Sequence, residues 1–205
     1  MTVGPSFVIR FVCGCLLALL CSGCGASPPV IYYNLTSLSV DQPRLAMKGA
    51  NLPLAIGLGP VSFPEALNRT QIAARLDPQR LQYSNVHRWS GPLEEGFSEV
   101  LLEDLAAHLP EDSRLALFPW EGYFRPTRRL ILQVSRFDGA LAGEVVLTAR
   151  WTITNPVGKE TLLSRQSRIQ VPVAGEGYDD LVIAESRAVA DLAGEIAEAL
   201  AGLER

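Results

Sequence analysis

A strict alternation of apolar and polar side chains runs from Glu144 to Thr154 and is the clearest pattern in the chain. A period of two residues predicts a β-strand with one buried and one solvated face. The side chains expected on the buried face are Val145, Leu147, Ala149, Trp151 and Ile153. Apolar and β-branched runs predict further strands at 31–35, 54–61, 115–118, 127–137 and 160–171. Two short strands joined by a turn at Asp77-Pro78 are expected within residues 65–90.

Two segments carry apolar residues at helical spacing. The first runs from about Pro92 to Leu109, with Gly91 as the expected N-cap, Pro92 as the first helical residue and Pro110 as the stop. The second covers roughly residues 179–203 and carries a continuous apolar stripe.

The order strands, helix, strands, helix predicts a single α+β domain. We expect a mixed or antiparallel sheet with the two main helices packed on one face. The other face would then be open and polar, and it would present Arg150, Arg165 and Arg168 to a partner.

The first 23 residues have the layout of a secretory signal peptide. Arg10 precedes an apolar run, 11–20, that is too short to span a bilayer. Ser22-Gly23-Cys24 resembles the lipobox of bacterial lipoproteins, although Cys21 stands where leucine is usual. This predicts a signal peptide over 1–23, lipidation at Cys24, a tether over 24–30 and one domain over 31–205. By the sorting rule for such lipoproteins, Gly25 in place of Asp favours the outer membrane, with the domain facing the periplasm.

Composition and cysteine placement narrow the classes of function. Of the 205 residues 48% are hydrophobic, which is typical of a globular domain, and the formal charge of −4 argues against nucleic-acid binding. All four cysteines lie at or before Cys24, so the mature domain has no thiol for a disulfide, a metal site or nucleophilic catalysis.

Catalytic chemistry has little support in the sequence. His87 and His108 are too few and too far apart for a metal centre, and we expect neither a metal nor a cofactor. Asp138-Gly139 is interpreted as a turn between strands, although Asp138 could pair with Glu144 as in glycoside hydrolysis. The sequence therefore favours a protein that is not an enzyme. The alternative is a lipidated periplasmic hydrolase that uses Asp138 or His87.

Two clusters are candidates for contact with a partner. His87, Arg88 and Trp89 precede the first helix and could bind an anionic headgroup or a carboxylate, or could be a strand end tied into the core. The segment 117–124 contains Phe118, Trp120 and Tyr123; it is either an exposed contact, since aromatic residues dominate interface hot spots, or a buried hinge.

Several short motifs follow one another along the chain, including Ile56-Gly57-x-Gly59-Pro60-Val61, Asn68-Arg69-x-Gln71-Ile72, His87-Arg88-Trp89 and Arg136-Phe137-Asp138-Gly139. In their order the chain resembles the PqiC family of ABC-type transport auxiliary lipoproteins over nearly all of its mature length. The resemblance implies a fold similar to the N-terminal domain of TolB and no catalytic residues. It also implies a role in lipid transport between the two membranes with a PqiB-like MCE-domain protein, supporting envelope integrity.

The sequence is also compatible with another role and with self-association. The chain could instead be a structural, TolB-like envelope assembly lipoprotein that binds protein and no lipid. Association into a homo-oligomer is also left open.

Overall fold

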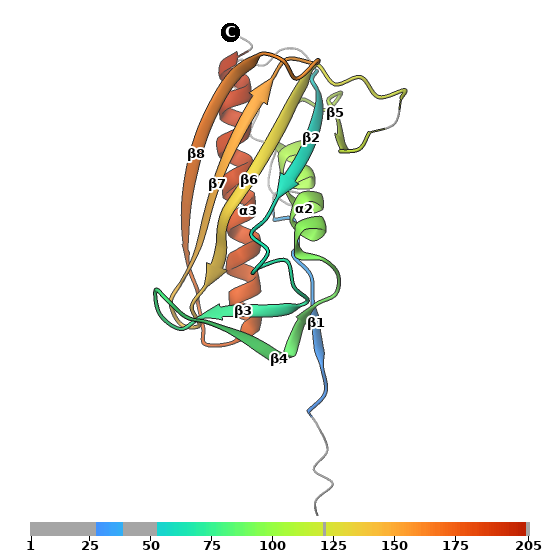
Figure 1. Cartoon of the computed structure of the whole chain (residues 1–205). Coiled ribbons are helices and arrows are strands. Elements are labelled where there is room, and N and C mark those ends of the chain that lie inside the picture. The colour runs from blue at the N-terminus through green and yellow to red at the C-terminus, as the bar shows by residue number, and fades with distance from the viewer. Residues whose placement is uncertain (1–27, 39–52, 121, 204–205) are drawn as a thin grey trace, which may run out of the picture.

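The structure is a computed structural model that describes residues 28–38, 53–120 and 122–203 (Figure 1). The predicted signal peptide and Cys24 lie outside these residues. The described chain forms one α+β domain, and the predicted fold class is confirmed.

Ten elements follow the predicted order closely. The strands are β1 (Ile31–Tyr33), β2 (Ala55–Ser62), β3 (Gln71–Arg75), β4 (Leu81–Trp89), β5 (Arg114–Leu117), β6 (Arg128–Gly139), β7 (Glu144–Thr154) and β8 (Thr161–Pro172). The helices are α2 (Leu93–His108) and α3 (Tyr178–Leu203). The bounds of β7 agree with the alternation in the sequence.

The strands form one mixed sheet of eight strands. Its larger part has the spatial order β5, β2, β6, β7, β8, in which β2 runs parallel to both neighbours and β6, β7 and β8 are antiparallel. Strand β3 pairs with β6 at Gly139, on the same edge of β6 as β2 but further along the strand. Strand β4 pairs with β3, and β1 pairs with β4 at the outer edge. Strand β2 is thus central, as its apolar sequence predicts.

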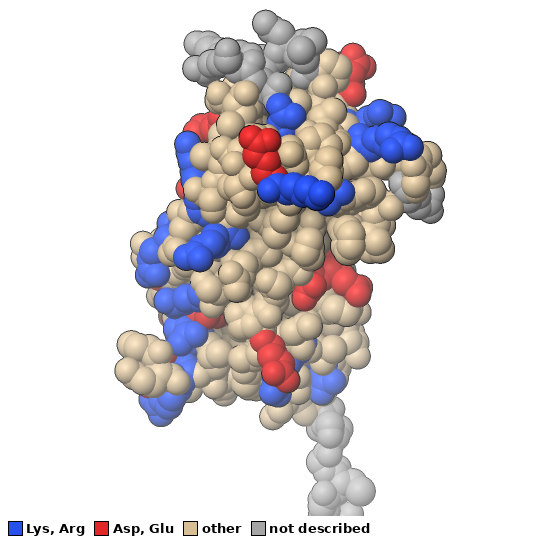
Figure 2. All heavy atoms as spheres, turned by 45° about the horizontal axis from the view of Figure 1, so that its top comes forward, with Lys and Arg blue, Asp and Glu red and all other residues tan. Residues whose placement is uncertain are grey.

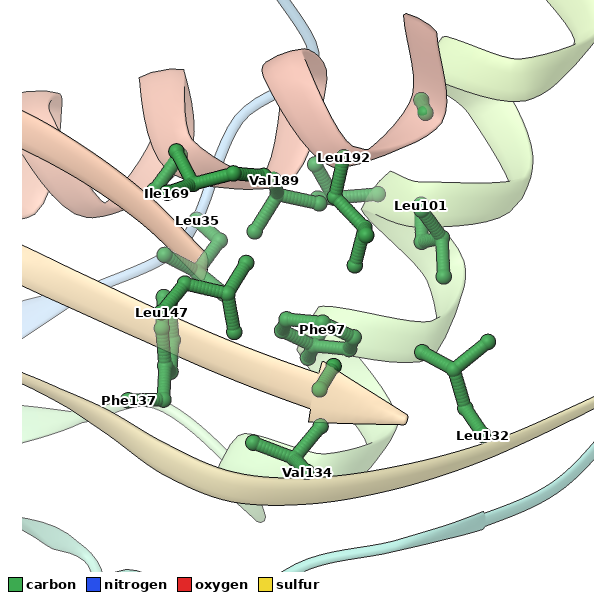
Figure 3. Packing of buried hydrophobic residues seen from close by; sticks show 14 of the residues in the cluster. Leu35, Phe97, Leu101, Leu132, Val134, Phe137, Leu147, Ile169, Val189 and Leu192 are labelled. Atoms are coloured by element: carbon green, nitrogen blue, oxygen red, sulfur yellow. The ribbon is translucent and has the colours of Figure 1, made fainter. Parts of the chain in front are cut away.

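Both helices pack on one face of the sheet (Figure 1). Phe97 of α2 is fully buried and meets Phe137 of β6 edge to face, with ring centroids 5.3 Å apart. Figure 3 shows Phe97 surrounded by leucine and valine side chains from the sheet and from both helices. Complete burial of such side chains stabilises a fold by about 1.5–3 kcal/mol each, so this layer is the main source of stability.

Three sequence predictions need correction. Asp138 and Gly139 are not a turn, because both pair with β7 as the last residues of β6, and the turn is at 140–143. Pro92, with an extended ψ of 129°, is the N-cap of α2, so Gly91 lies one residue outside it. Arg165 pairs with Trp151 and therefore lies on the helix-covered face of the sheet, not with Arg150 and Arg168 on the open face.

The segment after β1 is tied to both helices. Leu35 is buried between them, the backbone N–H of Thr36 donates to Ser186 Oγ at 3.2 Å, and Asp104 accepts from the Ser37 hydroxyl at 2.6 Å. The N-terminal part of the domain is therefore fixed to the core before the chain reaches β2.

The domain has two ends (Figure 1). The N-terminal end contains β1, the β3–β4 turn, the β6–β7 turn and the start of α3; the hydrogen bond from Ala142 N–H to the Gly175 carbonyl (3.1 Å) joins two of these segments. The distal half contains β5, the segment between β5 and β6, and the β7–β8 turn.

Candidate functional site

The segment 118–127, here called the distal loop, connects β5 to β6 and folds back over β2. A Cβ added at Gly57 would come within 2.8 Å of the Trp120 ring. Gly59 has φ +122°, and a Cβ there would come within 2.7 Å of the Phe118 Cβ. Close packing thus explains Gly57-Leu58-Gly59, because the two glycines make room for the loop.

Trp120 is the centre of an aromatic cluster. Phe118 meets it edge to face at 5.3 Å, Phe124 lies at 6.4 Å, and the Arg129 guanidinium lies over its ring at 5.1 Å from the centroid. A cation above an indole face contributes about 0.5–1 kcal/mol at exposed sites. Trp120 is half-buried by these contacts, whereas Phe118 and Tyr123 are 55% and 83% exposed. The loop combines a packed base with exposed aromatic rings.

Two hollows adjoin the distal loop. An open cavity of about 500 Å³ lies along β5 and is lined by Leu115, Leu117, Trp120 and Tyr123, among others. A smaller one of about 210 Å³ lies at Phe118 and is bordered by carboxylates at the start of α2, Glu94, Glu95 and Glu99. The exposed ring of Phe118 therefore stands beside an acidic surface.

His87, Arg88 and Trp89 lie at the N-terminal end, on the last residues of β4. Trp89 is only 5% exposed and belongs to the core. The Nδ1 atom of His87 lies 2.9 Å from the Tyr33 hydroxyl, and its ring stacks on Tyr178 with centroids 4.2 Å apart. These contacts match a strand end tied into the core, and the buried Trp89 ring is not available to a partner.

The Tyr33 hydroxyl is part of the same polar cluster. Burial, together with the Asp179 carboxylate beside it, raises the pKa of Tyr33 to about 12. Tyr33 therefore stays neutral and keeps its proton over the physiological range. Through Tyr33, His87 and Tyr178 the cluster joins β1, β4 and α3, which are distant in sequence.

The two predicted contact clusters are not brought together. His87, Arg88 and Trp89 lie beside the strand at which the chain enters the domain, whereas Phe118, Trp120 and Tyr123 lie in the distal half (Figure 1). A single partner surface that contains both clusters is therefore excluded by the fold.

The open face of the sheet is polar and basic. Arg150 and Arg168 are exposed there, on neighbouring strands, and form no ion pair with the part of the chain that the structure describes. Figure 2 shows basic side chains along the side where β7 and β8 lie. Gln133 and Gln166 flank Arg150 in the same cross-strand row, so the face offers donors but little apolar area.

Asp138, which the hydrolase alternative needs, is held in a buried ion pair. Its carboxylate is 2% exposed and accepts from Nε and Nη2 of Arg75, the latter at 2.8 Å, and from Arg136 Nε at 3.2 Å. A carboxylate so held has no free access to a substrate. Nothing in the sequence around Arg75, 63 residues earlier, identifies it as the partner of Asp138.

Close to this pair lies a second buried carboxyl group. Glu185 of α3 is 2% exposed, and its Oε2 atom has no hydrogen-bond partner among the described residues. Burial, and to a lesser degree the negative charge of Asp138, raises the pKa of Glu185 well above its ordinary value. The group is therefore favoured in its neutral form, which lowers the cost of burying it.

No helix within the described residues is long and apolar enough to cross a membrane. Residues 33–197 match the family described as the ABC-type transport auxiliary lipoprotein component, and this chain belongs to that family. Membership assigns the chain to transport lipoproteins, which implies attachment to a membrane.

Two solved structures share the fold. One is an uncharacterized protein with 18% identity and a TM-score of 0.69, covering 84% of this chain and 99% of its own. The other is a protein from Xanthomonas campestris with 13% identity and a TM-score of 0.67, covering 85% of this chain and 96% of its own. No match was found among curated proteins.

Proposed function

We propose that this protein is a non-catalytic component of an MCE-type lipid transport system, held on the outer membrane by a lipid on Cys24 and facing the periplasm. Its distal loop docks a PqiB-like MCE-domain protein that reaches across from the inner membrane. The docking supports envelope integrity by keeping the lipid path attached to the outer membrane. The family of transport auxiliary lipoproteins supports the class of function.

One geometric observation carries the proposal. The segment between β5 and β6, which carries the exposed residues Phe118 and Tyr123, lies in the half of the domain away from β1, the strand nearest to Cys24 in sequence (Figure 1). A domain anchored at its N-terminal end therefore directs these rings away from the membrane. Aromatic side chains on a packed base are typical hot spots of protein interfaces.

The segment between Cys24 and β1 is short, which limits how far the domain can lie from the membrane. Seven peptide units separate Cys24 from Ile31, which span at most about 25 Å when fully extended. The lipid can therefore lie close under the N-terminal end, and the distal half is the part that a partner from the opposite membrane meets first.

Photocrosslinking in cells tests the docking surface. A photoreactive residue in place of Tyr123 or Phe118 should give an adduct with an MCE-domain protein. Val157, which is 63% exposed and lies in the β7–β8 turn of the distal half, is the control and should give little. Equal adducts from Tyr123 and Val157, or none with an MCE protein, would overturn the proposed contact.

Crosslinking, together with lipid analysis and two substitutions, separates the alternatives. Adducts with other envelope proteins and no bound phospholipid would favour the structural, TolB-like role. The hydrolase alternative predicts that His87→Ala or Asp138→Asn abolishes an activity of the intact protein. The buried ion pair of Asp138 gives that alternative no support.

A further inference from the structure

Exposed apolar side chains gather at the N-terminal end of the domain. Nine large hydrophobic residues are exposed in the described ranges, and five of them lie at this end: Val30, Ile31, Tyr32, Leu76 and Leu141. Tyr32 is 64% exposed and Leu76 55%. Soluble domains rarely gather such side chains at one end without a contact that covers them.

The chain that leads into this end is free of charge. No charged residue occurs between Cys24 and Val40, and both faces of β1, Ile31 on one and Tyr32 on the other, are exposed apolar surface. Solvent-exposed edge strands usually carry charged side chains. An uncharged segment with an aromatic ring is instead typical of the interfacial region of a bilayer.

Leu76 is presented by a rigid turn. The Asp77 carboxylate accepts from the backbone N–H groups of Gln79 and Arg80, both at 2.9 Å, and binds the Arg80 guanidinium. At the base of the turn, Arg75 is fixed to Asp138. Leu76 therefore projects from an ordered hairpin.

We infer that the N-terminal end of the domain lies directly on the lipid bilayer, with Ile31, Tyr32 and Leu76 in its interfacial region. This inference rests on the proposed lipid at Cys24. That lipid holds Ile31, where the domain begins, within about 25 Å of the membrane, so the effective concentration of the N-terminal end at the bilayer is high and a weak apolar contact suffices. Glu176 and Asp179 are exposed at the start of α3, so the contact depends on apolar burial and not on attraction to anionic lipid.

The contact gives the anchored domain a direction. A domain on a flexible tether alone would rotate freely, whereas one seated on Tyr32 and Leu76 holds the distal loop away from the membrane. The bilayer contact and the partner contact then occupy opposite ends of one rigid unit.

Site-specific fluorescence on the full-length, lipidated protein tests this inference. The mature chain keeps one cysteine, Cys24, and lipidation consumes it, so one introduced cysteine can be labelled selectively. Tyr32→Cys, Leu76→Cys and Val157→Cys are each labelled with an environment-sensitive dye and reconstituted in phosphatidylcholine vesicles that contain a spin-labelled lipid quencher. Val157, 63% exposed, matches Tyr32 in exposure but lies in the distal half.

We expect the dyes at residues 32 and 76 to be quenched at least about twofold more than the dye at 157, with blue-shifted emission, since an interfacial residue lies about 5–10 Å into the bilayer boundary. Equal quenching at all three positions would overturn the inference. Flotation of the vesicles reports separately on the lipid anchor. A protein that floats but shows no quenching at 32 and 76 refutes the bilayer contact and leaves the proposed anchoring and docking intact.

Discussion

The ring of Trp120 lies against the backbone of Gly57, in a space that exists only because residue 57 has no Cβ. The two residues are far apart in sequence, and their contact holds the distal loop on the central strand β2. The exposed rings of Phe118 and Tyr123 thus belong to a loop whose base is packed into the domain.

Gly57→Val should displace Trp120 and release the distal loop. Overpacking of this kind costs about 1–3 kcal/mol. Tryptophan emission should shift to the red, because the other two tryptophans, Trp89 and Trp151, are buried. The crosslink from Tyr123 should weaken in parallel. Gly122→Ala in the same loop, where an added Cβ meets nothing within 4 Å, is the control and should change neither signal.

Arg75→Ala should destabilise the domain by about 3–5 kcal/mol, because it leaves the carboxylate of Asp138 buried and without its main partner. The double variant Arg75→Met, Asp138→Leu removes both charges and should recover most of that loss. Urea denaturation of the two variants measures the difference. A double variant as unstable as Arg75→Ala would show that the ion pair itself, and not the cost of an unpaired charge, stabilises this region.

Glu185→Gln should stabilise the domain increasingly as pH rises. The pKa of Glu185 in the folded state lies well above its ordinary value of 4.5, since burial disfavours the charged form. When the pKa of a group is higher in the folded state than in the unfolded state, its contribution to stability is complete below the pKa of the unfolded state. This contribution is lost as the pH rises through the pKa of the folded state. The urea midpoints of variant and wild type should therefore nearly agree at pH 4 and separate above it. A constant difference at all pH values would contradict a neutral, buried Glu185.

Gly25→Asp should retain the lipoprotein in the inner membrane, because residue 25 follows Cys24, the proposed lipidation site, and aspartate there opposes transfer to the outer membrane. Fractionation of the two membranes measures the distribution. Ser27→Asp places the same charge two residues later and should leave the protein in the outer membrane. Outer-membrane location of both variants would contradict the sorting signal.

Local periodicity was sufficient to predict most elements. Strand β7 agrees with its predicted bounds, and α2 differs by one residue at each end, since both depend on the spacing of apolar residues along one segment. The same alternation could also have placed Arg165 correctly. Residues three apart on an uninterrupted strand face opposite sides of the sheet, so Arg165 and Arg168 cannot share a face.

Such local patterns could not predict contacts between segments that are distant in sequence. Asp138-Gly139 resembles a turn locally, but pairing with β7 and the ion pair to Arg75 keep both residues in β6. The contact of Trp120 with Gly57 joins two segments whose individual sequences give no sign of each other. The placement of the two predicted contact clusters in different halves of the domain likewise follows from the topology and not from any motif.

The short strand β1 also has a mechanical consequence. It is hydrogen-bonded to β4 along its length, so a force applied to its N-terminus in the direction of the strand would load these bonds in shear, all at once, instead of peeling them one by one. At the end of the strand, Ser90 N–H donates to the Tyr33 carbonyl at 2.9 Å. In the segment that follows, Thr36 and Ser37 form hydrogen bonds to the two helices. A pull between two membranes would thus be carried into the whole core, and β1 would yield in a single step.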